Sequence, residues 1–137
     1  MADRVRKVAY FSMNVPNRPG EGARILAAIA DAGINLLAFT GFPAGGKAQI
    51  DFIPEKTAAF TVAARKAKIR VSAKKTGFLI QGEDRKGAVA RVLGKLAKSR
   101  INVTAIDALS AGKGRYGAIL WVKPKDVSKA SRVLGAS

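Results

Sequence analysis

One helical segment occurs twice in this chain with matching turns on either side, and this repeat limits the accessible folds more than any other feature. Asn17-Arg18-Pro19-Gly20 precedes the first copy of the segment, and Gly33-Ile34-Asn35 follows it. Asp84-Arg85-Lys86-Gly87 and Arg100-Ile101-Asn102 stand at the corresponding places 67 positions later. Two copies at one fixed offset predict two structural repeats.

The first copy alternates strand and helix patterns in the order β-α-β-β-α-β. Apolar residues on both faces predict a buried strand over residues 5–13, and 3.6-residue spacing predicts a helix that ends at Gly33 as a left-handed cap. The remaining expected elements are a loop over 14–20, strands over 34–42 and 48–53 around the turn 43–46, an Ala-rich helix that starts within 54–57 and runs to about residue 66, and a short strand over 68–72.

The second copy repeats this order but has no segment for a last strand before Ser137. Its expected elements are strands over 76–81, 101–109 and 116–122, a helix striped by Val89, Val92, Leu93, Leu96 and Ala97, and a final helix opened by Pro124. The strand over 76–81 should therefore have an unpaired edge. We expect that edge to be covered by the first copy or by a second chain.

These patterns predict an α+β fold made of two ferredoxin-like units in tandem. Each unit is expected to be an antiparallel sheet with both helices on one face, with domains at residues 1–74 and 75–137 divided at Lys74-Lys75. Units of about 60–70 residues bury too little surface to be stable alone. We therefore expect the two units to pack on each other, and a homodimer is consistent with the same argument.

The composition restricts the chemistry available to the chain. It has no Cys and no His, which excludes thiolate nucleophiles, Ser-His-Asp triads and His-ligated or Cys-ligated metal sites, and it has only 9 Asp and Glu. We expect no enzyme, no catalytic residues, no metal and no cofactor. No apolar run approaches about 18 residues, and the N-terminal residues lack an apolar signal-peptide core, so we expect a cytoplasmic protein without a membrane span.

The β-α-β-β-α-β order, with Asn-Arg-Pro-Gly before the first helix and Gly-Ile-Asn after it, resembles the ACT domain. The resemblance covers essentially the whole chain as two ACT-like copies without an attached catalytic domain. It implies a regulatory module that binds a small ligand, most often an amino acid, and passes the signal to a partner protein. Lys86 departs from the family pattern, because a proline is usual at that position.

In the ACT family the ligand generally lies between paired units, and the resemblance transfers this arrangement to two sets of residues. The loop of one unit would supply Asn17, Arg18, Pro19 and Gly20, or Asp84, Arg85 and Gly87, and the second strand of its neighbour would supply Asn102 and Val103, or Asn35 and Leu36. Helix N-termini attract carboxylates, arginines pair with anions, and asparagine offers a donor and an acceptor. The alternative interpretation is an ordinary helix start with solvent-facing arginines and asparagines that bond local backbone.

Two further patterns bear on phosphate-bearing partners, and only the second of them supports such a partner. Gly41-Phe-Pro-Ala-Gly-Gly46-Lys47 fits a phosphate loop, but Ala48 follows where Ser or Thr is needed, so we interpret it as a tight turn like Ala111–Gly114. Net charge is +16, with a basic cluster of Arg65, Lys66, Lys68, Arg70, Lys74 and Lys75 and a stripe of Arg91, Lys95 and Lys98. A nucleic-acid-binding or ribosome-associated module therefore stays open as the alternative function.

Overall fold

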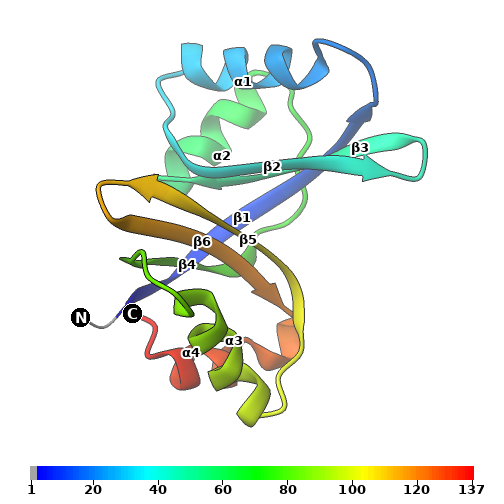
Figure 1. The fold of residues 1–137 in the computed structure, drawn as a ribbon. Helices are drawn as coiled ribbons and strands as arrows, with labels where there is room; N and C mark the ends of the chain where they lie inside the picture. The colour runs from blue at the N-terminus through cyan, green and yellow to red at the C-terminus, as the bar shows by residue number, and fades with distance from the viewer. Residues whose placement is uncertain (1–2) are drawn as a thin grey trace. The chain divides into compact units, whose positions relative to one another are not determined.

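The computed structural model describes residues 3–137 (Figure 1). Its elements are the strands β1 (Arg4–Pro16), β2 (Leu36–Ala44), β3 (Lys47–Pro54), β4 (Lys75–Glu83), β5 (Val103–Gly112) and β6 (Arg115–Val122), the helices α1 (Glu21–Asp31), α2 (Thr57–Lys66), α3 (Ala88–Lys98) and α4 (Val127–Leu134), and the short 3-10 helix η1 (Pro124–Asp126). The α+β class and the repeated β-α-β-β-α order are confirmed.

The chain divides into two compact units that do not follow the repeat strictly. The first unit is Ala9–Lys75, and the second unit is Thr76–Ser137 together with the N-terminal residues up to Val8. This differs from the division at 1–74 and 75–137 in two respects, of which the smaller is that Lys75 falls in the first unit. The residues before Ala9 belong with the second copy, although they are continuous with the first strand of the first copy.

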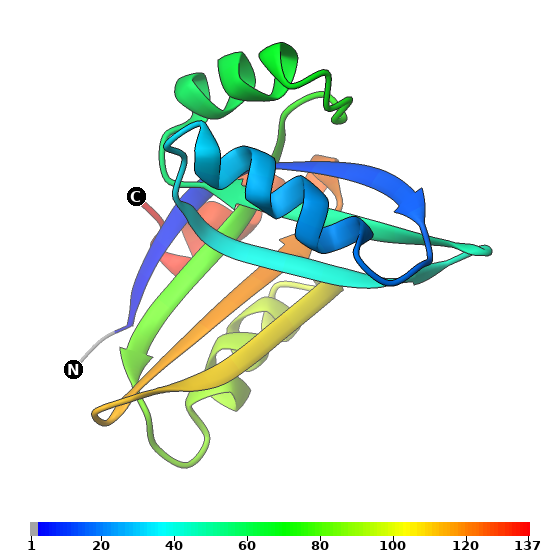
Figure 2. The same cartoon turned by 90° about the horizontal axis from the view of Figure 1, so that it is seen from above.

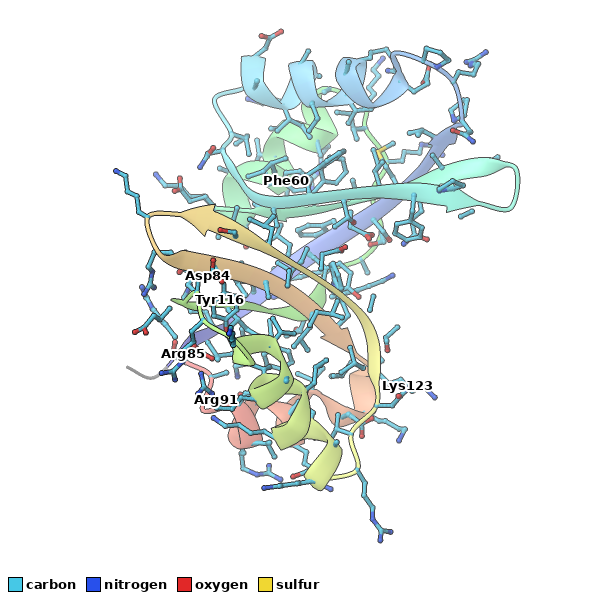
Figure 3. All side chains as sticks on the ribbon, viewed as in Figure 1. Phe60, Asp84, Arg85, Arg91, Tyr116 and Lys123 are labelled. Carbon is cyan, nitrogen blue, oxygen red and sulfur yellow. The ribbon has the colours of Figure 1, made fainter. Side chains whose placement is uncertain are left out.

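The first unit is a sheet in the order β2-β3-β1, with α1 and α2 on one face (Figure 1). Both strand pairs are antiparallel, and Phe52 lies opposite Phe11 on β1 and opposite Phe39 on β2. Phe60 of α2 lies between the helices and the sheet (Figure 3), with its ring centroid 5.0 Å from Phe11 and 5.5 Å from Phe52. The buried rings of Phe11, Phe52 and Phe60 form the centre of the unit's core.

The second unit places β4, β6 and β5 side by side (Figure 2). The outer edge of β4 is hydrogen-bonded to β1, whose Arg4–Val8 portion falls in this unit. The expectation that this edge is covered is confirmed, and residues from the start of the same chain cover it. Ser137 bonds to the same portion of β1, since its N–H donates to the Val5 carbonyl at 3.0 Å and its carbonyl accepts from the Lys7 N–H at 3.0 Å.

The sequence-based expectations are wrong at the end of β1 and after α2. Strand β1 continues through the expected loop at residues 14–16 and reaches Pro16, which lies opposite Lys47 at the end of the ladder. Residues 68–72 form no strand, because a side chain takes the place of a ladder bond. The Ser72 N–H donates to the Ser12 carbonyl at 2.8 Å, but the Ser12 N–H donates to the Ser72 Oγ at 3.0 Å.

The C-terminal ends of α1 and α3 share one cap geometry. The Ile34 N–H donates to the Ile29 carbonyl at 3.2 Å, and the Ile101 N–H donates to the Leu96 carbonyl at 2.9 Å. This pattern requires a left-handed residue just before the isoleucine. Gly33 fills that place with φ of 79°, as predicted, whereas the second copy uses Arg100 with φ of 57°. Because these caps engage the isoleucines, β2 and β5 begin at residues 36 and 103, two residues later than expected.

Candidate ligand-binding site

The loops before α1 and α3 end in the same backbone conformation. Gly20 and Gly87, the residues before the two helices, have φ of 89° and 79°. A Cβ added at either glycine would meet no atom within 4 Å. The positive φ, and not crowding, therefore explains glycine at these positions, and the space beside the loops is open to a ligand.

No side chain caps the N-terminus of either helix. The first backbone bonds of the two helices run from the Arg24 N–H to the Gly20 carbonyl at 2.9 Å and from the Arg91 N–H to the Gly87 carbonyl at 3.0 Å. The Glu21 and Ala88 N–H groups donate to the Arg18 and Arg85 carbonyls at 3.4 and 3.1 Å. The next N–H groups of each first turn have no intrahelical partner, and the positive end of the helix dipole lies there. Both helix starts can therefore accept an anionic group.

A hollow of about 320 Å³ adjoins this helix start in the first unit. It lies between the loop before α1 and the far end of β2, and its lining is Val15, Pro16, Asn17, Arg18, Glu21, Gly22, Phe39, Gly41, Phe42, Pro43, Ala48 and Ile50. The charges on the loop side are partly compensated. Glu21 pairs with Arg24 at 3.0 Å and with Arg18 at 3.6 Å.

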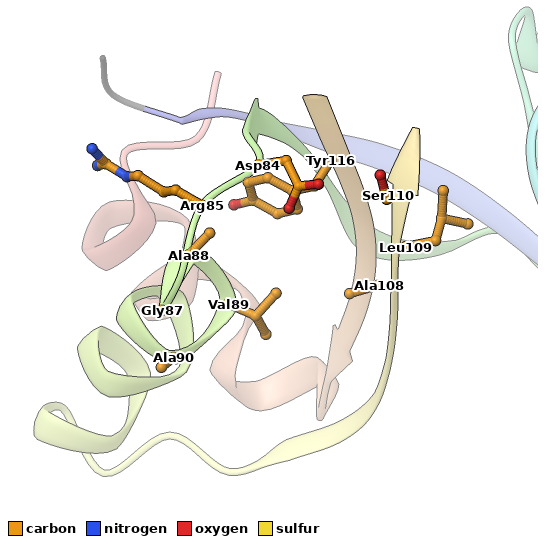
Figure 4. Close-up of a pocket in the computed structure, with 10 residues that line it drawn as sticks. All are labelled: Asp84, Arg85, Gly87, Ala88, Val89, Ala90, Ala108, Leu109, Ser110 and Tyr116. Atoms are coloured by element: carbon orange, nitrogen blue, oxygen red, sulfur yellow. The ribbon is translucent and has the colours of Figure 1, made fainter. Parts of the chain in front are cut away.

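A hollow of about 450 Å³ occupies the corresponding place in the second unit (Figure 4). Its lining is Asp84, Arg85, Gly87, Ala88, Val89, Ala90, Ala108, Leu109, Ser110 and Tyr116. Ala88 stands where the first unit has Glu21, and within residues 3–137 Arg85 makes no ion pair. Figure 4 shows the Arg85 side chain directed away from Leu109 and Ser110, so its guanidinium would have to turn toward the hollow to contact a ligand there.

Tyr116 forms the base of the second hollow and is held by a residue far away in the sequence. It is only 4% exposed, and its hydroxyl donates to Asp3 Oδ2 at 2.9 Å. The pKa of Tyr116 is raised to about 12, chiefly by burial and also by the hydrogen bond and charge of Asp3, while Arg91 lowers it. The tyrosine is therefore a neutral hydrogen-bond donor at ordinary pH. Gly82 lies opposite it on β4, where a Cβ would collide with the Asp3 side chain and the Tyr116 ring.

The structure brings together some of the predicted site residues within each unit. Asn17 and Arg18 line the first hollow with Pro19 and Gly20 beside them in the loop, and Asp84, Arg85 and Gly87 line the second. The predicted strand residues Asn35, Leu36, Asn102 and Val103 line neither hollow, because they follow the opposite ends of α1 and α3. Their pairing with a loop of the other copy stays a prediction.

The sequence analysis missed the apolar side chains on the strand side of each hollow. Phe42 is 46% exposed and Leu109 is 64% exposed, which is unusual for large apolar residues. They stand 67 positions apart, the same offset that relates the two loops. That shared offset is the signal that could have identified them, whereas nothing local marks Tyr116 or Asp3.

The remaining predicted motifs keep their expected forms. Gly45 and Gly46 make the turn of the β2–β3 hairpin, and residues 113–114 make the turn of β5–β6, so the phosphate-loop pattern is a tight turn as predicted. Arg91, Lys95 and Lys98 are exposed on α3 while Val92 and Leu96 are buried.

No helix within residues 3–137 is long and apolar enough to cross a membrane. In the described part of the chain, no group of three or more Asp and Glu side chains is placed to hold a metal ion.

No protein-family model and no curated protein matches the sequence. Solved structures do match: protein BT0572 from Bacteroides thetaiotaomicron superposes with a TM-score of 0.82 at 17% identity over 96% of this chain and 88% of that chain. Aspartokinase alpha and beta subunits match with a TM-score of 0.62 at 20% identity, over 98% of this chain and 95% of theirs. The ligand-free regulatory subunit of aspartate kinase from Thermus thermophilus matches with a TM-score of 0.65 at 14% identity, over 98% and 95%.

At such identities the comparisons show a shared fold only. The shared fold extends over nearly the full length of both chains in each comparison. The aspartate kinase subunits are ACT-domain proteins, so the resemblance seen in the sequence is confirmed at this level. The chain has the ACT-type tandem fold.

Proposed function

We propose that this protein is a non-enzymatic regulator that binds a small carboxylate-bearing ligand, of the amino-acid class, at the hollows beside α1 and α3. The observation that carries the proposal is the recurrence of one arrangement in both units. Each hollow combines an uncapped helix N-terminus, an arginine at the same loop position, and an exposed apolar residue at the end of the second strand. A repeated arrangement of this kind suits a ligand with an anionic head and an apolar side chain.

The carboxylate of the ligand would accept from the first-turn N–H groups and from Arg18 or Arg85. Its side chain would lie against Phe42 or Leu109, and Ser110 offers a hydroxyl for its ammonium group in the second unit. The exposed Phe42 and Leu109 also suit a second copy of the chain, which is why we propose a homodimer in which Asn35 and Asn102 complete the sites. If the ligand binds one arrangement of the paired units more tightly than another, its binding shifts the population toward that arrangement. A regulated partner protein that distinguishes the two arrangements would then respond to the ligand.

The fold agrees with this role, because one matched structure is named as the regulatory subunit of aspartate kinase. The first test is a thermal-shift screen of the standard amino acids at low salt and at about 150 mM salt. A ligand present at about 100 times its Kd should stabilise the fold by about 2.7 kcal/mol. Absence of stabilisation by every amino acid at millimolar concentration in both salts would contradict the proposal.

The second test locates the site by placing a carboxylate in each hollow. Ala90→Glu and Gly22→Glu put a charge at the first turn of α3 and α1, where the helix dipole stabilises it and where the ligand carboxylate should bind. Ala90→Gln and Gly22→Gln are matched controls of the same size without the charge. We expect calorimetric binding to weaken at least about tenfold for a glutamate relative to its glutamine control, since one charge contact is worth about 1.4 kcal/mol or more. Equal affinities for both members of each pair would show that the anion binds elsewhere.

A further inference from the structure

A larger hollow lies in the first unit, away from the loop before α1, between α2 and the segment that follows this helix. Its volume is about 810 Å³, which is within the range of small-molecule sites. Four cationic side chains line it, namely Arg65, Lys68, Arg70 and Lys74. Its apolar base includes Phe11 and Ile69, which are 5% and 9% exposed. The hollow therefore combines a cationic rim with an apolar floor.

The positive charge at this rim is not compensated by the protein. No Asp or Glu lines the hollow, and within residues 3–137 none of the four lining cations forms an ion pair shorter than 4.0 Å. Lys75, the neighbouring base, is engaged elsewhere, because its Nζ donates to Ser12 Oγ at 3.4 Å. Four like charges around one concavity raise its potential and favour an anion.

The negative end of the α2 dipole explains only part of this cluster. Cations stabilise the last turn of a helix, which accounts for Arg65. Arg70 and Lys74 lie beyond the helix end, where the effect of the dipole has largely fallen off. A binding role accounts for all of the lining cations together.

Lys68 adds a second, independent observation. It adopts φ of 59° as the left-handed residue that closes α2, with its N–H donating to the Arg65 carbonyl at 3.1 Å. The corresponding residue at the end of α4 is Gly135, with φ of 66°. Glycine adopts this conformation without the strain that a lysine bears. Lysine at this place therefore destabilises the fold relative to glycine while it adds a cation to the rim.

We propose that this hollow binds an organic anion that has an apolar body and a phosphate, sulfonate or carboxylate head. The cations bind the head, and the floor around Phe11 and Ile69 binds the body. A free inorganic anion would leave the apolar floor unused. A nucleic-acid strand would lack a stacking platform here, because Phe11 is nearly buried.

The test uses the fluorescent aromatic sulfonate 8-anilino-1-naphthalenesulfonate as the probe, titrated at about 150 mM salt so that loose attraction is screened. The variant is Lys68→Gly, which removes a rim cation and relieves the backbone strain. The matched control is Arg100→Gly, which makes the same kind of change at the left-handed end of α3, outside the lining of the hollow. We expect Lys68→Gly to raise the unfolding midpoint while it weakens the probe about fivefold, and Arg100→Gly to raise the midpoint without changing the probe's Kd.

Four results would overturn the proposal. Equal weakening by both variants would indicate attraction to net charge alone, and an unchanged Kd in Lys68→Gly would place the probe elsewhere. Displacement of the probe by inorganic phosphate at equal concentration would show that the apolar floor contributes nothing. A short single-stranded RNA that displaces the probe more strongly than any small organic phosphate would indicate a nucleic-acid surface instead. These outcomes are independent of amino-acid binding at α1 and α3, so the two proposals fail separately.

Discussion

Arg100→Gly should stabilise the second unit, because the wild-type arginine holds a backbone conformation that favours glycine. Arg100 has φ of 57° and closes α3, with its N–H donating to the Ala97 carbonyl at 3.0 Å. Its side chain is exposed and makes no ion pair within residues 3–137. The substitution therefore acts chiefly on the backbone preference and removes neither a buried side chain nor an ion pair of the described residues.

Two opposing terms set the size of the effect. A non-glycine residue in the left-handed region costs about 1–2 kcal/mol. Glycine loses about 0.4–1 kcal/mol more conformational entropy on folding than a residue with a Cβ. The strain term is the larger one, which leaves a gain of about 0.5–1 kcal/mol in the free energy of unfolding. The reverse substitution, Gly33→Arg at the same cap of α1, should destabilise the first unit by a similar amount.

Urea unfolding provides the assay, with two probes that separate the units. Trp121 is the only tryptophan and lies on β6, so its fluorescence follows the second unit, while circular dichroism follows all helices. Arg100→Gly should shift the fluorescence midpoint upward by about 0.3–0.5 M, given an ordinary m-value. A lower midpoint in Arg100→Gly, or an unchanged midpoint in Gly33→Arg, would refute the argument that backbone strain at this cap limits stability.

Three further predictions concern the cores and the Tyr116 hydrogen bond. Gly82→Ala should destabilise the fold by about 1–3 kcal/mol in urea unfolding, because its Cβ would collide with Asp3 and Tyr116, whereas Gly117→Ala, whose nearest neighbour would be 3.9 Å away, should be tolerated. Since the pKa of Tyr116 is raised to about 12, the stability that this residue contributes is complete below about pH 10 and is lost as pH rises toward 12. Tyr116→Phe should flatten that decline in the free energy of unfolding. An unchanged pH profile in the variant would count against Tyr116 as the group that titrates. Phe60→Ala should cost about 3–5 kcal/mol, because the ring is fully buried, and a smaller loss by circular dichroism would indicate a core that collapses around the cavity.

The repeat in the sequence was sufficient to predict the order of the elements, because each rests on local periodicity. The prediction of individual elements was wrong where the effect of a residue depends on its position in the sheet. Pro43 reads as a turn residue, yet it lies within β2, an outer strand of the sheet where a missing N–H can face solvent. Residues 68–72 read as a strand, yet the Ser72 hydroxyl replaces the backbone acceptor that a ladder needs.

The candidate site was predictable only where it is local. Loop residues such as Arg18 and Arg85 could be named, because the turn and the helix that follows are encoded in a few adjacent residues. Tyr116 could not, because its position depends on Asp3, which is 113 residues away. No periodicity in the sequence reports such a contact.

The two hollows differ in charge and volume, and this difference predicts different affinities for an anionic ligand. In the first unit, Glu21 lies at the helix start and pairs with Arg18 and Arg24, so part of the positive field that would attract a carboxylate is already neutralised. In the second unit Ala88 replaces that acid at the helix start, the one lining carboxylate is Asp84 in the loop, and the hollow is larger, at about 450 Å³ against 320 Å³. At the helix start itself, an anionic head therefore meets no carboxylate beside α3, whereas Glu21 competes with it beside α1. Although Lys86 departs further from the family pattern, charge and volume favour the second copy as the tighter sensor, so the Ala90→Glu pair should lose more binding than the Gly22→Glu pair.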